Sequence, residues 1–110
     1  MKFCISLYQI VRMMKIRNKE LLNKYTSKHV SVKNSLQRWV DIVEESEWKS
    51  HNDLKQDFPS ADYVGNGRYV FNIQGNNHRL IAIALFIEGY LKIRFVGTHA
   101  EYDKVDCKTI

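Results

Sequence analysis

The sequence predicts an α+β domain in which helices precede a small antiparallel sheet. Between residues 18 and 58 the apolar side chains recur every three or four positions, which is the spacing of helices. From Tyr63 onward they recur every second position, which is the spacing of strands. The chain has 110 residues, enough for one hydrophobic core and too few for two. Helical segments followed by strand segments are typical of the α+β class.

The first half of the chain predicts one short strand and three helical segments. A strand is expected around residues 13–17, followed by a helix that Asn18 caps and that ends near His29. Ser31 is the expected cap of a second helix, and the two helices are expected to form a hairpin. The second helix carries a continuous apolar stripe at Val32, Leu36, Trp39, Val40 and Val43. Asn52 is expected to cap a short third helix, which Pro59 stops.

The second half predicts a three-stranded antiparallel meander, joined by the strand at 13–17. Gly-Asn-Gly at 65–67 and the polar residues 74–77 are turn sequences on either side of the strand 68–73. The almost wholly apolar run 78–87 predicts a central strand, and a turn at 88–89 leads into a last strand. In that last strand, alternation places Leu91, Ile93 and Phe95 on one face, with Lys92 and Arg94 on the other.

Positive charge is concentrated at the start of the chain. The net charge is +5, and residues 1–34 hold eight Lys or Arg and one Glu. Such a surface raises the local concentration of polyanions such as RNA, although a solvated lysine-rich surface would show the same composition. Apolar runs are too short for a membrane helix, and Cys4 and Cys107 are expected to be free thiols. We therefore expect a cytoplasmic protein with no membrane contact.

The residues at the end of the last strand suit cleavage of an RNA phosphodiester by its own 2′-hydroxyl. That reaction needs a base, an acid and fixed cations around the phosphate. Arg68, Arg79 and Arg94 lie on predicted strands, and His99 and Tyr102 follow the last strand directly. No metal and no cofactor is needed for this chemistry. The alternatives are structural: arginines paired with acids, a histidine that caps a turn and a tyrosine that fills the edge of the core.

A metal site is a rival interpretation of the same segment. His99, Asp103 and Cys107 are spaced by four residues, so one helix would place them on one face, and His78 could complete the set. This ligand combination matches no common structural zinc pattern. We therefore expect no metal ligands.

Three stretches together resemble the HigB family of toxins from bacterial type II toxin-antitoxin operons. They are SEWKSHNDLKQDFPSADYVGNGRYV (46–70), FNIQGNNHRLIAIALF (71–86) and IRFVGTHAEYDKVDCKTI (93–110). The resemblance covers residues 14–110 and implies a RelE-like fold, a two-helix hairpin packed against a small antiparallel β-sheet. Residues 1–13 precede the usual family start, and represent either a misassigned start or an extra strand.

The resemblance implies a ribosome-dependent mRNA endonuclease that inhibits translation. It also implies a HigA-type helix-turn-helix antitoxin as partner, with operator DNA contacted only through that antitoxin. Arg79, His99 and Tyr102 match the family pattern, and Arg94 is the next candidate. Under this hypothesis Arg79 and Arg94 hold the scissile phosphate, while His99 and Tyr102 share proton transfer without a metal ion. The remaining candidates, expected to contact RNA or the ribosome, are Lys55, Arg68 and Lys92. The alternative function is a non-catalytic RNA-binding or complex-forming protein that retains the fold.

Overall fold

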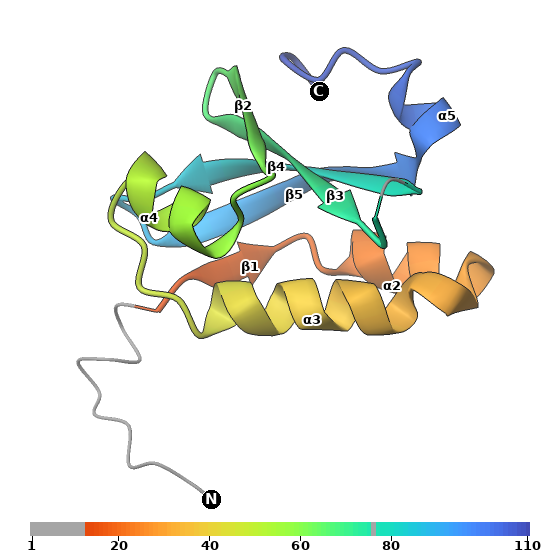
Figure 1. Cartoon of the computed structure of the whole chain (residues 1–110), viewed down its shortest axis with the longest axis horizontal. Helices are drawn as coiled ribbons and strands as arrows, with labels where there is room; N and C mark the ends of the chain where they lie inside the picture. Colours follow the sequence, from red (N-terminus) through yellow and green to blue (C-terminus); the bar gives the residue numbers. More distant parts are fainter. Residues whose placement is uncertain (1–12, 76) are drawn as a thin grey trace, which may run out of the picture.

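A five-stranded sheet forms the centre of the molecule in the computed structural model, which describes residues 13–75 and 77–110 (Figure 1). The strand order is β1-β5-β4-β3-β2; β1 is parallel to β5 and the other neighbours are antiparallel. The elements are β1 (Lys15–Arg17), α2 (Glu20–Lys28), the 3-10 turn η1 (Val30–Val32), α3 (Lys33–Glu44), α4 (His51–Asp57), β2 (Asp62–Gly65), β3 (Arg68–Ile73), β4 (His78–Leu85), β5 (Tyr90–Thr98) and α5 (His99–Tyr102). The predicted α+β class is confirmed. Of the N-terminal extension (residues 1–13), residues 1–12 lie outside the described residues, and with them the extra strand that was considered there.

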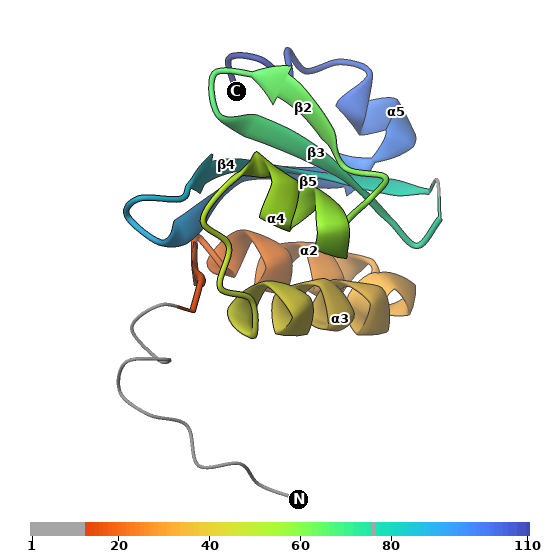
Figure 2. The same cartoon turned by 60° about the vertical axis from the view of Figure 1, so that its left-hand side comes forward.

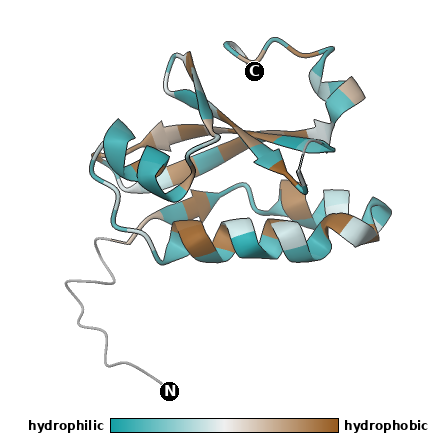
Figure 3. Cartoon of the chain, viewed as in Figure 1, coloured by the Kyte–Doolittle hydropathy of each residue, from teal (hydrophilic) through white to brown (hydrophobic). Residues whose placement is uncertain are grey.

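The helices α2 and α3 lie together on one face of the sheet, as Figures 1 and 2 show from two directions. The predicted apolar stripe is confirmed, because all five of its side chains are buried, the first (Val32) in η1 and the other four on α3. Tyr69, Phe71 and Ile73 of β3 are buried in the same core, in which the ring centres of Phe71 and Trp39 lie 5.4 Å apart. In Figure 3 the apolar residues lie along the strands and at intervals on α3, with hydrophilic residues between them. No helix within the described part of the chain is long and apolar enough to cross a membrane.

The predicted helix caps are wrong at all three positions. Asn18 has a positive φ of 68° and its side chain donates to the carbonyl of Ile93 at 3.0 Å, so it ties the start of α2 to β5 instead of capping the helix. Ser31 lies within η1. Asn52 lies within α4, and the residue that precedes this helix is Ser50. Tertiary hydrogen bonds and a short 3-10 turn replace the local caps that the sequence predicts.

The predicted meander of β3, β4 and β5 is confirmed. β2, which was not predicted, joins it next to β3. β2 pairs with β3 through a turn in which Asn66 and Gly67 both have positive φ, 53° and 75°. Two central residues with positive φ match the right-handed twist of a hairpin. The turn sequence was recognised, but the four residues of β2 are too few to show an alternating pattern.

A β-bulge in β5 changes which side chains share a face. Ile81 of β4 pairs with Phe95, whereas its neighbour Ala82 pairs with Ile93, so Arg94 is the extra residue. A bulge shifts the two-residue alternation by one position. The expectation that Phe95 shares a face with Leu91 and Ile93 is therefore wrong.

The chain end covers the sheet face opposite α2 and α3. Figures 1 and 2 show α5 and the following residues on that side of the sheet. Arg68 and Asn66 donate hydrogen bonds to main-chain oxygens of residues 108–110. We call this sheet face the open face and residues 103–110 the tail.

Candidate active site

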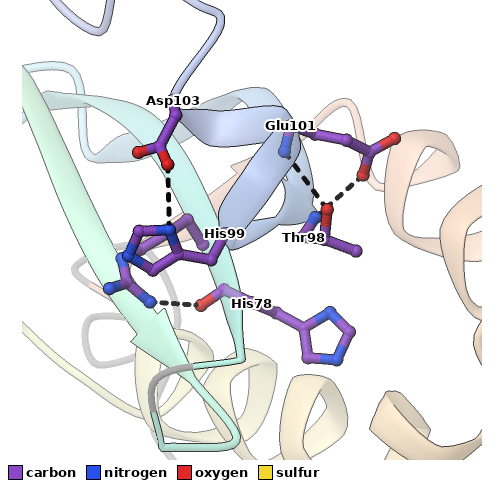
Figure 4. A network of polar contacts seen from close by, with 6 residues as sticks. His78, Thr98, His99, Glu101 and Asp103 are labelled. Atoms are coloured by element: carbon purple, nitrogen blue, oxygen red, sulfur yellow. Dashed lines mark hydrogen bonds and ion pairs between the residues drawn. The ribbon is translucent and has the colours of Figure 1, made fainter.

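A complete capping box fixes the short helix α5 to the end of β5. The Thr98 hydroxyl accepts a hydrogen bond from the main-chain N–H of Glu101 at 3.2 Å, and the Glu101 carboxylate accepts one from Thr98 N–H at 2.8 Å (Figure 4). The main-chain hydrogen bond from Thr98 is also the main reason that the pKa of Glu101 is lowered. This arrangement gives a defined starting direction to the turn that carries His99 and Tyr102.

The glycine just before the cap is required by close packing. A Cβ atom on Gly97 would lie 2.5 Å from Cζ of Phe95 and 3.0 Å from Oε1 of Glu101, both shorter than ordinary contacts. Gly97 also pairs with Arg79 of the neighbouring strand. The absence of a side chain lets the Phe95 ring and the capping carboxylate approach the strand that leads into α5.

Tyr102 lies near both Arg79 and His99 on the open face. The Arg79 guanidinium carbon is 5.8 Å from the centre of the Tyr102 ring, and the His99 ring centre is 6.4 Å from it. Arg79 is only 8% exposed, and its guanidinium donates to the carbonyl of His78 at 3.2 Å. The structure therefore brings together the three residues that match the family pattern.

Burial is the main cause that raises the pKa of Tyr102. The neighbouring Cys107 raises it further, while the positive charge of Arg79 lowers it. The phenol is therefore protonated at neutral pH and can donate a proton.

Asp103 is a further candidate site residue, to which the sequence analysis gave no role beside His99. Its Oδ2 lies 3.2 Å from Nδ1 of His99, and the two side chains are 61% and 50% exposed (Figure 4). A carboxylate that holds the proton of Nδ1 leaves Nε2 as the ring nitrogen that can accept a proton. The spacing of four residues was visible in the sequence, where it was considered only for a metal site, and that site was not expected.

Arg94 does not join this group. As the bulged residue of β5 it lines a pocket of about 590 Å³ on the α2 side of the strand, together with Lys24, Lys28 and His29. Its guanidinium therefore belongs to a different cationic surface from that of Arg79.

The three predicted RNA contacts have different surroundings. The Lys55 ammonium donates to the main-chain oxygens of Pro59 at 2.8 Å and Ala61 at 2.5 Å, which holds the loop after α4. Arg68 binds the tail. Lys92 pairs in the sheet with Ile83 and Arg17, and the guanidinium of Arg17 lies 4.2 Å from the ring centre of Tyr90. Of these three residues, only Lys92, which lies on a strand, has no evident structural role.

The four residues of the rival metal site do not come together as a set in the structure, although His99 and Asp103 are in contact. α5 ends at Tyr102, so no helix aligns His99 with Cys107, and His78 faces α2, where its Nδ1 is 2.6 Å from the Tyr25 hydroxyl. Among residues 13–75 and 77–110 no group of three His, Cys, Asp or Glu side chains is arranged to hold a metal ion.

His78 belongs to a second group of titratable residues, beneath the sheet. Its ring contacts Tyr25 and lies 5.9 Å from the ring of His29, which stacks on Tyr25 at 4.2 Å. Burial lowers the pKa of His78 and raises that of Tyr25. The sheet separates this group from Tyr102 and His99.

The fold and this arrangement of Arg, Tyr and His define a RelE-like toxic component of a toxin-antitoxin system, the description of the family model that matches residues 32–105. The chain belongs to the HigB toxin family. It is 32% identical over 93 residues to the mRNA interferase toxin HigB of Escherichia coli strain K12, an alignment that covers 82% of this chain and 88% of that protein. It is 30% identical over 66 residues to the mRNA interferase HigB of E. coli strain CFT073, covering 58% of this chain and 64% of the relative.

Proposed function

We propose that this toxin cuts mRNA on the ribosome and thereby stops translation in the cytoplasm until a HigA-type antitoxin neutralises it. The names of its relatives describe mRNA interferases, which supports the substrate. The observation that carries the chemistry is that Tyr102 lies near both the Arg79 guanidinium and the His99 ring. A fixed cation and two proton-transferring groups on one surface are what phosphodiester cleavage requires.

The reaction needs no group beyond these side chains. Nε2 of His99 removes the proton of the RNA 2′-hydroxyl, and Asp103 stabilises the imidazolium that forms. The 2′-oxygen attacks the phosphorus, the bond to the 5′-oxygen breaks, and Tyr102 donates the proton that the leaving oxygen takes. The products are a 2′,3′-cyclic phosphate and a 5′-hydroxyl. The positive charge of Arg79 stabilises the negative charge that builds on the phosphate and on Tyr102.

Contacts with the message extend along the open face towards β1. Lys92 and Arg17 are neighbours in the pairing of β5 and β1, so their charges can hold the RNA backbone beside the reacting phosphate. The second cationic surface, around Arg94, lies on the α2 side of β5 and does not contribute to this path.

The test is primer extension on a translated message incubated with purified toxin and ribosomes. We expect discrete cuts within codons from the parental protein. Arg79→Lys and His99→Ala should each lose at least about 100-fold in cleavage rate, the typical loss for a general acid-base group or a transition-state contact. Because Arg79 is buried, we choose lysine and not alanine as its replacement. Circular dichroism checks that each variant is folded.

Antitoxin binding provides the control for these variants. Both should still bind the antitoxin and should no longer arrest growth. Cleavage at the parental rate by both variants contradicts the assignment of the site. Ribosome binding by the parental protein without any cut message would instead support the non-catalytic RNA-binding alternative.

A further inference from the structure

Two candidate site residues lie on a single helical turn. His99 begins α5 and Tyr102 ends it. The main-chain N–H of Asp103 donates to the His99 carbonyl at 3.1 Å and closes this turn. One turn is not stable by itself, because its formation fixes several backbone angles in return for one hydrogen bond. Contacts outside the turn or from its side chains must therefore hold α5 in place.

The capping box supplies two of these contacts, and both use a side chain. The Thr98 hydroxyl accepts a hydrogen bond from the main-chain N–H of Glu101, and the Glu101 carboxylate accepts one from the main-chain N–H of Thr98. His99 lies between the two bonded residues, and its own N–H donates to the carbonyl of Asn77 at 3.1 Å. Tyr102 follows Glu101 directly. The capping bonds therefore fix the main chain on both sides of the proposed base and next to the proposed acid.

The Glu101 carboxylate itself lies away from the proposed reaction. Residues two apart on a helix do not face each other, and Figure 4 shows Glu101 and Asp103 on opposite sides of α5. Glu101 lines the pocket on the α2 side of β5 together with His29, whereas His99 contacts Asp103 and Tyr102. A carboxylate in this place fixes the turn without exchanging a proton with RNA on the open face.

We propose that Thr98 and Glu101 are positioning residues, whose reciprocal capping bonds hold α5 so that His99 and Tyr102 both face the scissile phosphate. This inference rests on the proposed cleavage of mRNA. It gives the two side chains a role in the rate of the reaction and none in binding the message. The bonds need a hydroxyl at position 98 and an oxygen acceptor at position 101. Serine and glutamine meet these needs, whereas valine and alanine do not.

Steady-state cleavage on programmed ribosomes tests this role. For Thr98→Val and Glu101→Ala we expect kcat to fall about 5- to 30-fold, the factor by which the loss of an N-cap shifts the equilibrium of a helix end. KM should stay at the parental value, because neither side chain faces the message. Thr98→Ser and Glu101→Gln keep the capping bonds and should retain most of the parental kcat.

The matched controls make the same changes elsewhere on the surface. Thr26→Val removes a hydroxyl from α2, and Glu45→Ala removes an exposed carboxylate at the end of α3. Both should cleave like the parent. Circular dichroism checks that every variant is folded.

A second measurement does not depend on activity. Amide hydrogen exchange, followed by NMR, should accelerate at Glu101 in Thr98→Val and at Thr98 in Glu101→Ala. Each variant removes the acceptor of that particular N–H group. Exchange at Ile81, which is fully buried in β4, should stay slow in both variants.

The outcomes separate this inference from the proposed function. Parental kcat in both Thr98→Val and Glu101→Ala overturns the inference, as does unchanged amide exchange or a defect confined to KM. An equal loss in Glu101→Gln and Glu101→Ala also overturns it, since the negative charge would then act in place of the hydrogen bond. In these cases the parental protein still cuts the message, and the proposed function stands. A parental protein that leaves the message intact contradicts the proposed function, and the inference falls with it.

Discussion

The Nδ1 atom of His99 lies 3.2 Å from a carboxylate oxygen of Asp103, one helical turn further along the chain. This relationship makes Asp103 the orienting partner of the proposed base. We predict that Asp103→Asn lowers the cleavage rate about 10-fold or more, since the amide cannot stabilise the imidazolium as the carboxylate does. Rates measured on programmed ribosomes check this, with the exposed Asp41→Asn as control. If Asp103→Asn cleaved at the parental rate, the contact would be only a surface ion pair with no part in the reaction.

Tyr102→Phe removes the proposed proton donor and keeps the ring beside Arg79. We predict a fall in kcat of about 100-fold, the lower range for a general acid. The free energy of unfolding should change by only about 1 kcal/mol, the usual value of one hydrogen bond. Urea unfolding and cleavage assays on the same sample separate these effects. Tyr63→Phe, at an exposed position on β2, is the matched control. Full cleavage by Tyr102→Phe would exclude the hydroxyl from the reaction.

Gly97→Ala should damage both the fold and the site. The new methyl group would meet Cζ of Phe95 and Oε1 of Glu101, so the ring or the capping carboxylate must move. We predict a loss of about 1–3 kcal/mol in the free energy of unfolding, as for overpacked cores. The displacement of α5 should also lower the cleavage rate. Unchanged stability in urea titrations would show that Phe95 can rotate away without cost.

Acid should destabilise the protein through His78. Burial is the main cause that lowers the pKa of His78, and His29 lowers it further while Glu101 acts in the opposite direction. The unfolded chain therefore binds a proton at a higher pH than the folded chain does. The stabilisation is complete above the unfolded pKa of about 6.5 and is lost as the pH falls from there towards the folded pKa.

Urea midpoints measured at pH 8, 6.5 and 5.5 test this prediction. The parental midpoint should fall across the two lower values, and His78→Asn should flatten that fall. Glu101 does not interfere in this range, because its lowered pKa places its contribution at more acid values. Equal pH dependence in both proteins would assign the acid sensitivity to other groups.

The sequence predicted the parts of the fold that depend on repeated patterns. The stripe of α3 and the alternation in β3 extend over enough positions to define a buried face, and both are buried as expected. β2 was missed because four residues show no period. The face of Phe95 was wrong because one extra residue in β5 shifts the alternation, and the bulge becomes visible only through the register with β4.

The candidate site shows the same difference between features with a local sequence pattern and features without one. Arg79, His99 and Tyr102 were predicted together and lie together, because β4, β5 and α5 are adjacent along the chain and in space. The tail contact of Arg68 joins segments that are far apart in the sequence, so no local pattern could reveal it. Asp103 was noticed for its spacing, but the sequence analysis assigned it no role beside His99.

The parallel pairing of β1 with β5 sets an order of events during synthesis. Lys15 lies opposite Tyr90, so β1 gains its partner only after most of the polypeptide has left the ribosome. α5 follows β5 directly, so His99 and Tyr102 are still unmade when β1 emerges. A nascent chain therefore lacks these candidate site residues for most of the time in which its own message is being translated.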